Sequence, residues 1–498
     1  MTPEEFRRAG HDLIDWIADY RARMNAGEAR VMPDVSPGWV HGQLPTSPPA
    51  KGEPFEHLIR DLNRIVAPAC FNFQHPRFHG FFPANVTLVS LLGDLVSGGL
   101  GQLGLNWQSS PALTELEEVM TDWLRQMLGL SIAWQGTIHD TASTASLVAM
   151  LCARERALAK KSSAGGLQVS EKPLTVYYSV ISHSSIEKAA MLAGFGRDNL
   201  RPIPADSSHR LRVDELENTV KGDFAAGRQP CAMIATTGTT AVGSFDPIAA
   251  MAKIARRHQI WLHVDAAMAG SGMICPEQRH LWEGVESADS LVLNPHKWLG
   301  VAFDCSVYYV RDVQHLVRVM SSNPSYLQTS ADGAVKNYRD WGIPLGRRFR
   351  ALKLWFLIRE QGVEGLRRRL RRDLENARWF ASEVERTNGW RVLNRVELQT
   401  VCVRHEPQGL EGDALDRHTQ AWASRINQSG RAYLTSAILN GQWMVRVSIG
   451  AEATERKHLE ELWALMRAEA EHAAPGTSSP RGAPRPVAQG TQNRGRGR

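Results

Sequence analysis

Hydrophobic and polar positions follow two different patterns along this chain. Between about residues 85 and 362, helical stretches alternate with short apolar runs, which is typical of an α/β domain with a mostly parallel sheet. Two of these runs, at residues 260–265 and 291–293, have the length and apolar content of buried parallel strands. From residue 363 onward, a long helical stretch is combined with strand-like runs at 399–403 and 443–449, which predicts a smaller α+β domain.

The first residues carry a strong helix-start signal. Thr2-Pro3-Glu4-Glu5 has the spacing of a capping box, with proline at the first helical position. A proline-rich linker at 32–54 and a second helix at 55–66 follow, and such an arm cannot bury its apolar faces alone. We therefore predict four parts: an N-terminal helical arm (1–84), a large α/β domain (85–362), a small α+β domain (363–475) and a tail (476–498).

The net charge of +6 comes almost entirely from the tail. Residues 476–498 contain five arginines and no acidic residue, and they are too poor in apolar side chains to order themselves. A second basic run, at 367–372, is typical of the solvated face of a helix. Because no nucleic-acid-binding motif accompanies either run, the charge does not predict a specific nucleic-acid partner.

Other common functions lack their sequence signals. No apolar stretch reaches the roughly 18 residues of a membrane span, and the start lacks the pattern of a secretory signal, so we expect a cytoplasmic protein. The six cysteines are scattered without a Cys-x-x-Cys pair, which indicates neither a disulfide framework nor a zinc site. Residues 99–104 fit the dinucleotide pattern G-x-G-x-x-G, but a helical stretch precedes them where that site requires a strand.

Candidate chemistry lies at the ends of the two predicted strands. Asp265 closes the run at 260–265, and Lys297 follows the run at 291–293. Ligands of open α/β sheets bind at the carboxyl ends of the strands. An amine and a carboxylate at neighbouring strand ends suit pyridoxal phosphate, because lysine binds its aldehyde as a Schiff base and a carboxylate keeps its ring nitrogen protonated.

The residues around this pair carry a resemblance to a known family. His263-Val264-Asp265-Ala266-Ala267 and Asn294-Pro295-His296-Lys297-Trp298, with segments at 75–78, 82–83, 110–117, 182–185, 238–240 and 343–349, run in one order along nearly the whole chain. This order resembles the group II pyridoxal-phosphate-dependent decarboxylases, most closely the aromatic-L-amino-acid decarboxylases. The resemblance implies a fold type I enzyme, similar to aspartate aminotransferase, that forms a homodimer with active sites at the subunit interface and with the N-terminal arm packed across it.

The resemblance also implies roles for individual residues. Asp265 and Lys297 would bind the cofactor ring and aldehyde, His183 would stack on the ring, and His296 would contact the phosphate or the substrate. The phosphate contacts would be Ala142, Ser143, Thr240 and Asn294; the first two precede a predicted helix at 146–158, whose positive end favours an anion. The polar segment 321–341 is typical of a mobile lid, and its Tyr326 matches the tyrosine that protonates Cα of the substrate in this family.

Substrate choice depends on a second set of matches. Phe81, Phe82 and Pro83 match the apolar pocket wall of the family, which suits an aromatic side chain. Gly346 stands where histidine decarboxylases carry serine, which argues against histidine. The sequence departs from the family pattern at Ala84 and Leu105, near Leu103, and this wider pocket favours indole among tryptophan, tyrosine, phenylalanine and DOPA.

Two other kinds of function stay open on the sequence: another reaction of the same cofactor, and nucleic-acid binding. The same cofactor supports an aldehyde synthase or an aminotransferase, and Arg446 could bind a substrate carboxylate as aminotransferases do. Aldehyde synthases of this family often replace the lid tyrosine or the stacking histidine, so Tyr326 and His183 favour decarboxylation. A nucleic-acid-binding protein is the remote alternative, based on the arginine-rich tail alone.

Overall fold

A computed structural model describes residues 1–159, 161–322 and 325–472; the predicted tail lies outside the described residues. Its larger sheet has the strand order β1-β7-β6-β5-β4-β2-β3; β7 pairs antiparallel with β1 and β6, and the other pairs are parallel. This sheet confirms the predicted α/β class. The strands are β1 (Gln135–His139), β2 (Leu174–Ser179), β3 (Leu200–Ile203), β4 (Gln229–Thr236), β5 (Trp261–Asp265), β6 (Ser290–Leu293) and β7 (Ser306–Val310).

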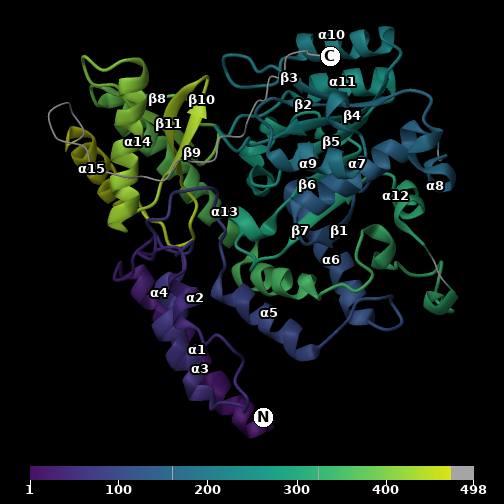
Figure 1. Ribbon diagram of the computed structural model, residues 1–498. Helices are drawn as coiled ribbons and strands as arrows, with labels where there is room; N and C mark the ends of the chain where they lie inside the picture. Colours follow the sequence, from purple (N-terminus) through teal and green to yellow (C-terminus); the bar gives the residue numbers. More distant parts are fainter. Residues whose placement is uncertain (160, 323–324, 473–498) are drawn as a thin grey trace.

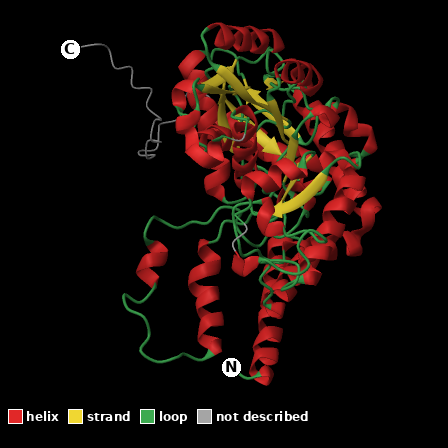
Figure 2. Ribbon diagram, turned by 90° about the vertical axis from the view of Figure 1, so that its right-hand side faces the viewer, coloured by secondary structure: helices red, strands yellow, loops and turns green. Residues whose placement is uncertain are grey.

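Helices cover both faces of the large sheet, as Figures 1 and 2 show. Successive side chains of a strand point to opposite faces, so Leu262 and Val264 of β5 join one core cluster and Trp261 joins the other. The first cluster packs against α6 (Pro111–Leu128), α10 (Val213–Ala225), α11 (Ile248–His258) and α13 (Arg350–Arg386). The second packs against α7 (Ala142–Ala157), α9 (Ser184–Leu192) and α12 (Val313–Met320), and the short α8 (Ser162–Gly165) follows α7.

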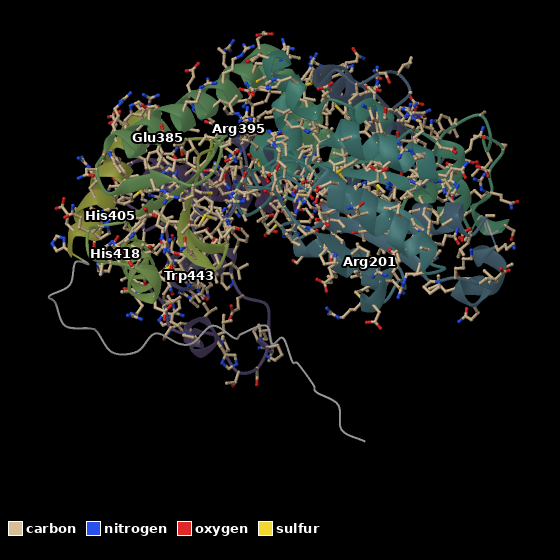
Figure 3. All side chains as sticks on the ribbon, turned by 90° about the horizontal axis from the view of Figure 1, so that it is seen from above. Arg201, Glu385, Arg395, His405, His418 and Trp443 are labelled. Atoms are coloured by element: carbon tan, nitrogen blue, oxygen red, sulfur yellow. The ribbon has the colours of Figure 1, made fainter. Side chains whose placement is uncertain are left out.

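The smaller sheet is antiparallel, with the order β10-β11-β9-β8. It consists of β8 (Trp390–Val392), β9 (Thr400–His405), β10 (Thr435–Leu439) and β11 (Gln442–Ser448), with α14 (Gly412–Ser429) and α15 (Arg456–His472) beside it. From above, His405, His418 and Trp443 of this unit lie on the opposite side of the molecule from Arg201 of β3 (Figure 3). Helix α13 contacts both units and is interrupted at Gly362, whose φ of +62° favours glycine. We propose this residue as the boundary between the large and small domains.

The N-terminal helices project from the body of the molecule (Figure 1). They are α1 (Pro3–Asn25), α2 (Trp39–Gln43), α3 (Phe55–Asp61) with the turn η1 (Leu62–Val66), and α4 (Ala67–Ala69). The Thr2–Glu5 capping box is present, and Trp16 of α1 donates its indole N–H to Asn63 at 2.8 Å. The next helix, α5 (Leu88–Leu100), exposes a row of apolar side chains: Leu88, Leu92, Leu95, Val96 and Leu100. Within the described ranges, no helix is both long and apolar enough to cross a membrane.

The basic run at 367–372 is only in part the solvated face that the sequence predicted: Arg368 is exposed, but other arginines of the run bind the folded chain. Arg369 donates to the carbonyl of Leu299, and Arg372 donates to the carbonyl of Glu452 at 2.9 Å. Arg371 forms an ion pair with Glu277 at 2.7 Å. The run therefore holds α13 against the loops around it, because its guanidinium groups reach backbone carbonyls that only the folded chain brings close.

A buried ion pair joins three segments beneath the large sheet. Arg347 lies 2.6 Å from the carboxylate of Glu117 on α6, and the side chains are 5% and 1% exposed. The same carboxylate accepts the N–H of Ile138 and the hydroxyl of Thr137, both on β1. The segment after the predicted lid is thus tied to α6 and to an edge strand.

We expect Arg347→Ala to destabilise the protein by about 3–5 kcal/mol, because Glu117 would be left as an uncompensated buried charge. The neighbouring Arg348, which is 54% exposed and pairs with Asp94, is the matched control and should cost about 1 kcal/mol or less. Denaturant unfolding of the two alanine variants measures the difference. Equal losses would show that the ion pair does not hold these segments together.

Candidate active site

A cavity of about 190 Å³ lies at the carboxyl ends of β4, β5 and β6. Both predicted strand-end residues, Asp265 and Lys297, line it. The other lining residues are Phe82, Thr141, Ala142, Ser143, His183, Ser185, Thr236, Thr237, Gly238, Thr240, Ala267, Met268, Asn294 and His296. The fold therefore brings together residues that lie more than 200 positions apart in the chain.

Asp265 and Lys297 come to the same edge because β5 and β6 are parallel neighbours, with Asp265 opposite Val292. Lys297 lies in the helical turn η7 (Pro295–Leu299) directly after β6, and its Nζ is 5.5 Å from the centre of the Phe82 ring. Burial lowers the pKa of the Lys297 amine, and the negative charge of Asp265 acts in the opposite direction. The site thus makes the amine easier to deprotonate, and so more nucleophilic, beside a carboxylate.

His183 forms the N-cap of α9 at the rim of the same cavity. Its Nδ1 accepts the backbone N–H of Ser185 at 3.2 Å, so the neutral ring carries its proton on Nε2. Burial lowers the pKa of His183, and the charge of Lys297 lowers it further. Both effects keep the ring neutral near pH 7, with one N–H available to a ligand.

One end of the cavity has the donors that a phosphate requires. Helix α7 begins at Ala142 with Thr141 as N-cap, four residues earlier than predicted, so Ala142 and Ser143 lie in its first turn. N–H groups of a first turn have no acceptor within the helix and face the positive end of the helix dipole. Thr240 and Asn294 also line the cavity. The side-chain oxygen of Asn294 accepts the Ser306 hydroxyl at 2.7 Å, which leaves its side-chain NH₂ group as a donor.

His296 is buried directly before the lysine. Its Nδ1 accepts the N–H of Cys305 at 2.8 Å, and its ring lies 4.7 Å from that of Phe303. Burial lowers the pKa of His296 to about 3, with the charge of Lys297 as the next cause. The imidazole is therefore neutral at physiological pH and offers only Nε2–H as a donor to the cavity.

The predicted apolar wall is only partly assembled within one chain. Phe82 lines the cavity, whereas Phe81 is 47% exposed and packs with Phe73 and Tyr433. Pro83 and Ala84 do not line the cavity either. The predicted pocket residues Leu103, Leu105 and Gly346 do not line this cavity. A Cβ at Gly346 would lie 2.9 Å from Leu103, so these two residues are close to each other outside the cavity.

The predicted lid is described in part. Residues Ser325–Leu327 form the short turn η8, but the side chain of Tyr326 lies outside what the structure describes. The lid segment ends in η9 (Tyr338–Trp341), whose Tyr338 and Trp341 are buried. The proton-donor role of Tyr326 stays a prediction.

Sequence reasoning missed several cavity residues. Met268 lies three positions after Asp265, and its sulfur accepts the amide N–H of buried Gln399 at 3.2 Å. Ser185, Thr236 and Thr237 also line the cavity. The sequence did hold a signal for them: Ser185 is near His183, Thr236 and Thr237 are at the end of β4, and Met268 follows Asp265. Residues that flank a strand end lie at the same edge of the sheet.

The residues present fit pyridoxal phosphate. Lys297 supplies an amine of lowered pKa for an aldehyde. One oxygen of Asp265 accepts the Ala267 N–H at 3.0 Å, and the other has no hydrogen bond within the described ranges, so it can pair with a protonated ring nitrogen. The first turn of α7 supplies donors for a phosphate dianion. Amine, carboxylate and anion site thus match the three polar ends of this cofactor.

Comparisons with known proteins agree with this chemistry. Residues 37–406 match the model of the pyridoxal-dependent decarboxylase conserved domain. The chain is 38% identical to aromatic-L-amino-acid decarboxylase of Sus scrofa, over 94% of this chain and 96% of that protein. It is 37% identical to phenylacetaldehyde synthase of Arabidopsis thaliana, over 95% and 97%. The crystal structure of Oryza sativa TDC with PLP and tryptamine superimposes with a TM-score of 0.92 and 34% identity, over 95% and 99% of the two chains.

The pKa of Lys297 is directly testable in cofactor-free protein. An ordinary lysine has a pKa of about 10.4. Because burial disfavours the ammonium form of Lys297, its acylation should reach half the maximal rate below that pH. Asp265→Asn removes the charge that favours the ammonium, so the midpoint should fall further. Peptide-resolved mass spectrometry measures both midpoints, with exposed Lys253 as the internal reference. A midpoint of Lys297 at or above the ordinary value would contradict this electrostatic account.

Proposed function

The chain belongs to the pyridoxal-dependent decarboxylase family, and from that premise we propose that it converts an aromatic L-amino acid to the corresponding amine and carbon dioxide. Family membership makes it a carboxy-lyase with pyridoxal phosphate as cofactor. The observation that carries the proposal is the meeting of Lys297 and Asp265 in one cavity beside the first turn of α7. The proposed substrates are tryptophan, tyrosine, phenylalanine and DOPA.

In the proposed site, the cofactor when bound accepts the electron pair that the departing carbon dioxide leaves behind. Lys297 would hold it covalently through its amine, and Asp265 would hold a proton at the ring nitrogen. His183 would cover one face of the ring, while Ala142, Ser143, Thr240 and Asn294 would bind the phosphate. His296 would add its Nε2–H as a neutral donor, since its pKa of about 3 keeps it uncharged.

Arg446 supports binding of a substrate carboxylate. This arginine of β11 is 2% exposed, and its Nε and Nη2 have no hydrogen-bond partner within the described ranges. Its guanidinium lies 5.0 Å from the centre of the Phe82 ring, and the Lys297 amine lies 5.5 Å from the same centre. A buried guanidinium with unpaired donors favours an anionic ligand. Decarboxylases and aminotransferases both bind such a carboxylate, so Arg446 does not distinguish between them.

Two observations support an aromatic substrate. Phe82 is a large aromatic side chain of the cavity wall beside Lys297, and aromatic rings pack well against such a wall. The tryptamine in the Oryza sativa TDC structure is an indole amine. Together with Ala84 and Leu105, which are smaller than the family residues they replace, this similarity favours tryptophan as the first substrate to test.

We also propose a homodimer with active sites at the subunit interface. The apolar row on α5 is exposed in the single chain, and a row of leucines is typical of a protein contact. A second copy packed there would also explain why Phe81, Leu103, Leu105 and Gly346 match substrate residues of the family without lining the cavity of their own chain.

An aldehyde synthase is the second candidate function. The similarity to the phenylacetaldehyde synthase of Arabidopsis thaliana is about as strong as that to the decarboxylase of Sus scrofa. Tyr326 and His183, which such synthases often replace, favour the amine as the main product.

The proposed reaction is tested by incubating the purified enzyme with each amino acid and with DOPA. We expect amine and carbon dioxide in equal amounts from aromatic substrates, with visible absorbance from the bound cofactor. Lys297→Ala should abolish repeated turnover and that absorbance, because no amine remains to hold the aldehyde. Lys253→Ala, at an exposed lysine of α11, should behave as wild type. Multiple turnovers by the Lys297 variant at near the wild-type rate would remove Lys297 from the mechanism.

The choice between amine and aldehyde is tested at Tyr326. Tyr326→Phe keeps the ring and removes the acidic proton, so amine formation should slow by roughly 10²–10⁴-fold, the usual effect of losing one general acid. Carbon dioxide release should continue, and the product should shift toward aldehyde with ammonia and peroxide. The amine-to-aldehyde ratio under air measures this shift. An unchanged ratio and rate would mean that another group, such as His183, donates the proton.

A further inference from the structure

Three chain segments meet beside Lys297, and one buried side chain joins them. The segments are residues 83–87 after the Phe82 wall, residues 297–300 at the end of η7, and residues 449–452 after β11. Asn85 lies at their centre and is completely buried. No motif in the sequence marks it.

Asn85 contacts both of the other segments through hydrogen bonds. Its backbone N–H donates to the carbonyl of Lys297 at 3.3 Å. Its side-chain amide donates to the carbonyl of Gly450 at 2.6 Å and accepts the N–H of Glu452 at 2.9 Å. One residue therefore binds the backbone of the lysine turn and the backbone of the loop that follows β11.

Close packing leaves this junction little freedom to shift. A Cβ at Gly450 would lie 2.9 Å from Pro83 and 3.2 Å from the indole of Trp298, the residue after Lys297. That indole donates to Asp373 of α13 at 2.9 Å. The Thr87 N–H donates to the carbonyl of Gly300 at 3.1 Å. The lysine turn is thus held on two sides, and Asn85 supplies the polar contacts between them.

The junction connects the two basic side chains of the site. Gly450 lies four residues after Arg446 in the same strand and loop, and Asn85 lies three residues after Phe82, whose ring is 5.0 Å from Arg446 and 5.5 Å from the Lys297 amine. A shift of the loop against the lysine turn would change the separation of amine and guanidinium.

We propose that Asn85 is a positioning residue that sets the lysine turn against the loop after β11, and through it Lys297 against Arg446. The inference rests on the proposed function, in which Lys297 holds the cofactor and Arg446 binds the substrate carboxylate. It assigns to Asn85 an effect on reaction geometry in addition to its effect on stability. A misplacement of about 1 Å can cost an enzyme roughly 10²-fold in rate.

Asn85→Ala is best compared with Asn427→Ala. Asn427 of α14 also uses both amide atoms, which bind the backbone N–H and carbonyl of Leu434 at 2.8 and 3.0 Å, but it touches no cavity residue. Both variants should lose thermal stability. Only Asn85→Ala should lower kcat per bound cofactor, by roughly 10–100-fold, and shift the pH midpoint of the visible absorbance of the bound cofactor. Asn427→Ala should stay within about twofold of wild type, since its site is intact.

Gly450→Ala tests the same junction without removing a hydrogen bond, and it remains informative if Asn85→Ala does not fold. Its new methyl group would press on Pro83 and Trp298, so we expect the same loss of kcat and the same kind of spectral shift. If the Asn85 and Gly450 variants match Asn427→Ala in kcat and in pH midpoint, Asn85 is an ordinary packing residue and the proposal is wrong. Failure of the wild-type enzyme to release carbon dioxide would instead overturn the proposed function.

Discussion

The parallel pairing of β5 with β6 is the constraint on which the site depends. Because parallel neighbours end at the same edge of a sheet, the residue that closes β5 and the turn that follows β6 meet there without any long side-chain reach. Asp265 and Lys297 occupy those two places. The loop after β4 and the first turn of α7 open onto the same edge, so the proposed cofactor site is a consequence of strand order.

Burial gives this edge its chemical character. The same loss of water contact lowers the pKa of Lys297, His183 and His296, so the two histidines are neutral and the lysine amine loses its proton more readily than an exposed lysine does. Positive potential remains at the N-terminus of α7 and at Arg446, which has no acidic partner within the described ranges. An amine of lowered pKa between two anion-binding groups is the arrangement that an aldehyde cofactor with a phosphate and a carboxylate substrate require.

The smaller sheet and its loops contribute contacts to the cavity that the large sheet bears. Arg446 reaches Phe82 from β11, Gln399 orients Met268, and the loop after β11 packs against Trp298. The arginines of α13, which bind carbonyls on both sides, keep this unit in place. Part of the proposed active site is therefore built at the contact between the two sheet-containing units, and its geometry depends on how firmly that contact is held.

The sequence alone was enough to predict the α/β class, the strands ending at Asp265 and before Lys297, the capping box of α1 and the family with its cofactor. Each of these features is recorded in short segments of the sequence or in the order of such segments along the chain, and short apolar runs, caps and motifs record local preferences directly. Other features depended on which distant segments come into contact. Phe82 lines the cavity while adjacent Phe81 packs outside it, and Arg369 of the basic run binds the carbonyl of Leu299 instead of facing solvent. Asn85 contacts both Lys297 and Gly450, the second across 365 positions. Only the tertiary structure decided these features. Adjacent residues of the same type can point in different directions, and contacts between remote segments exist only after the chain has folded.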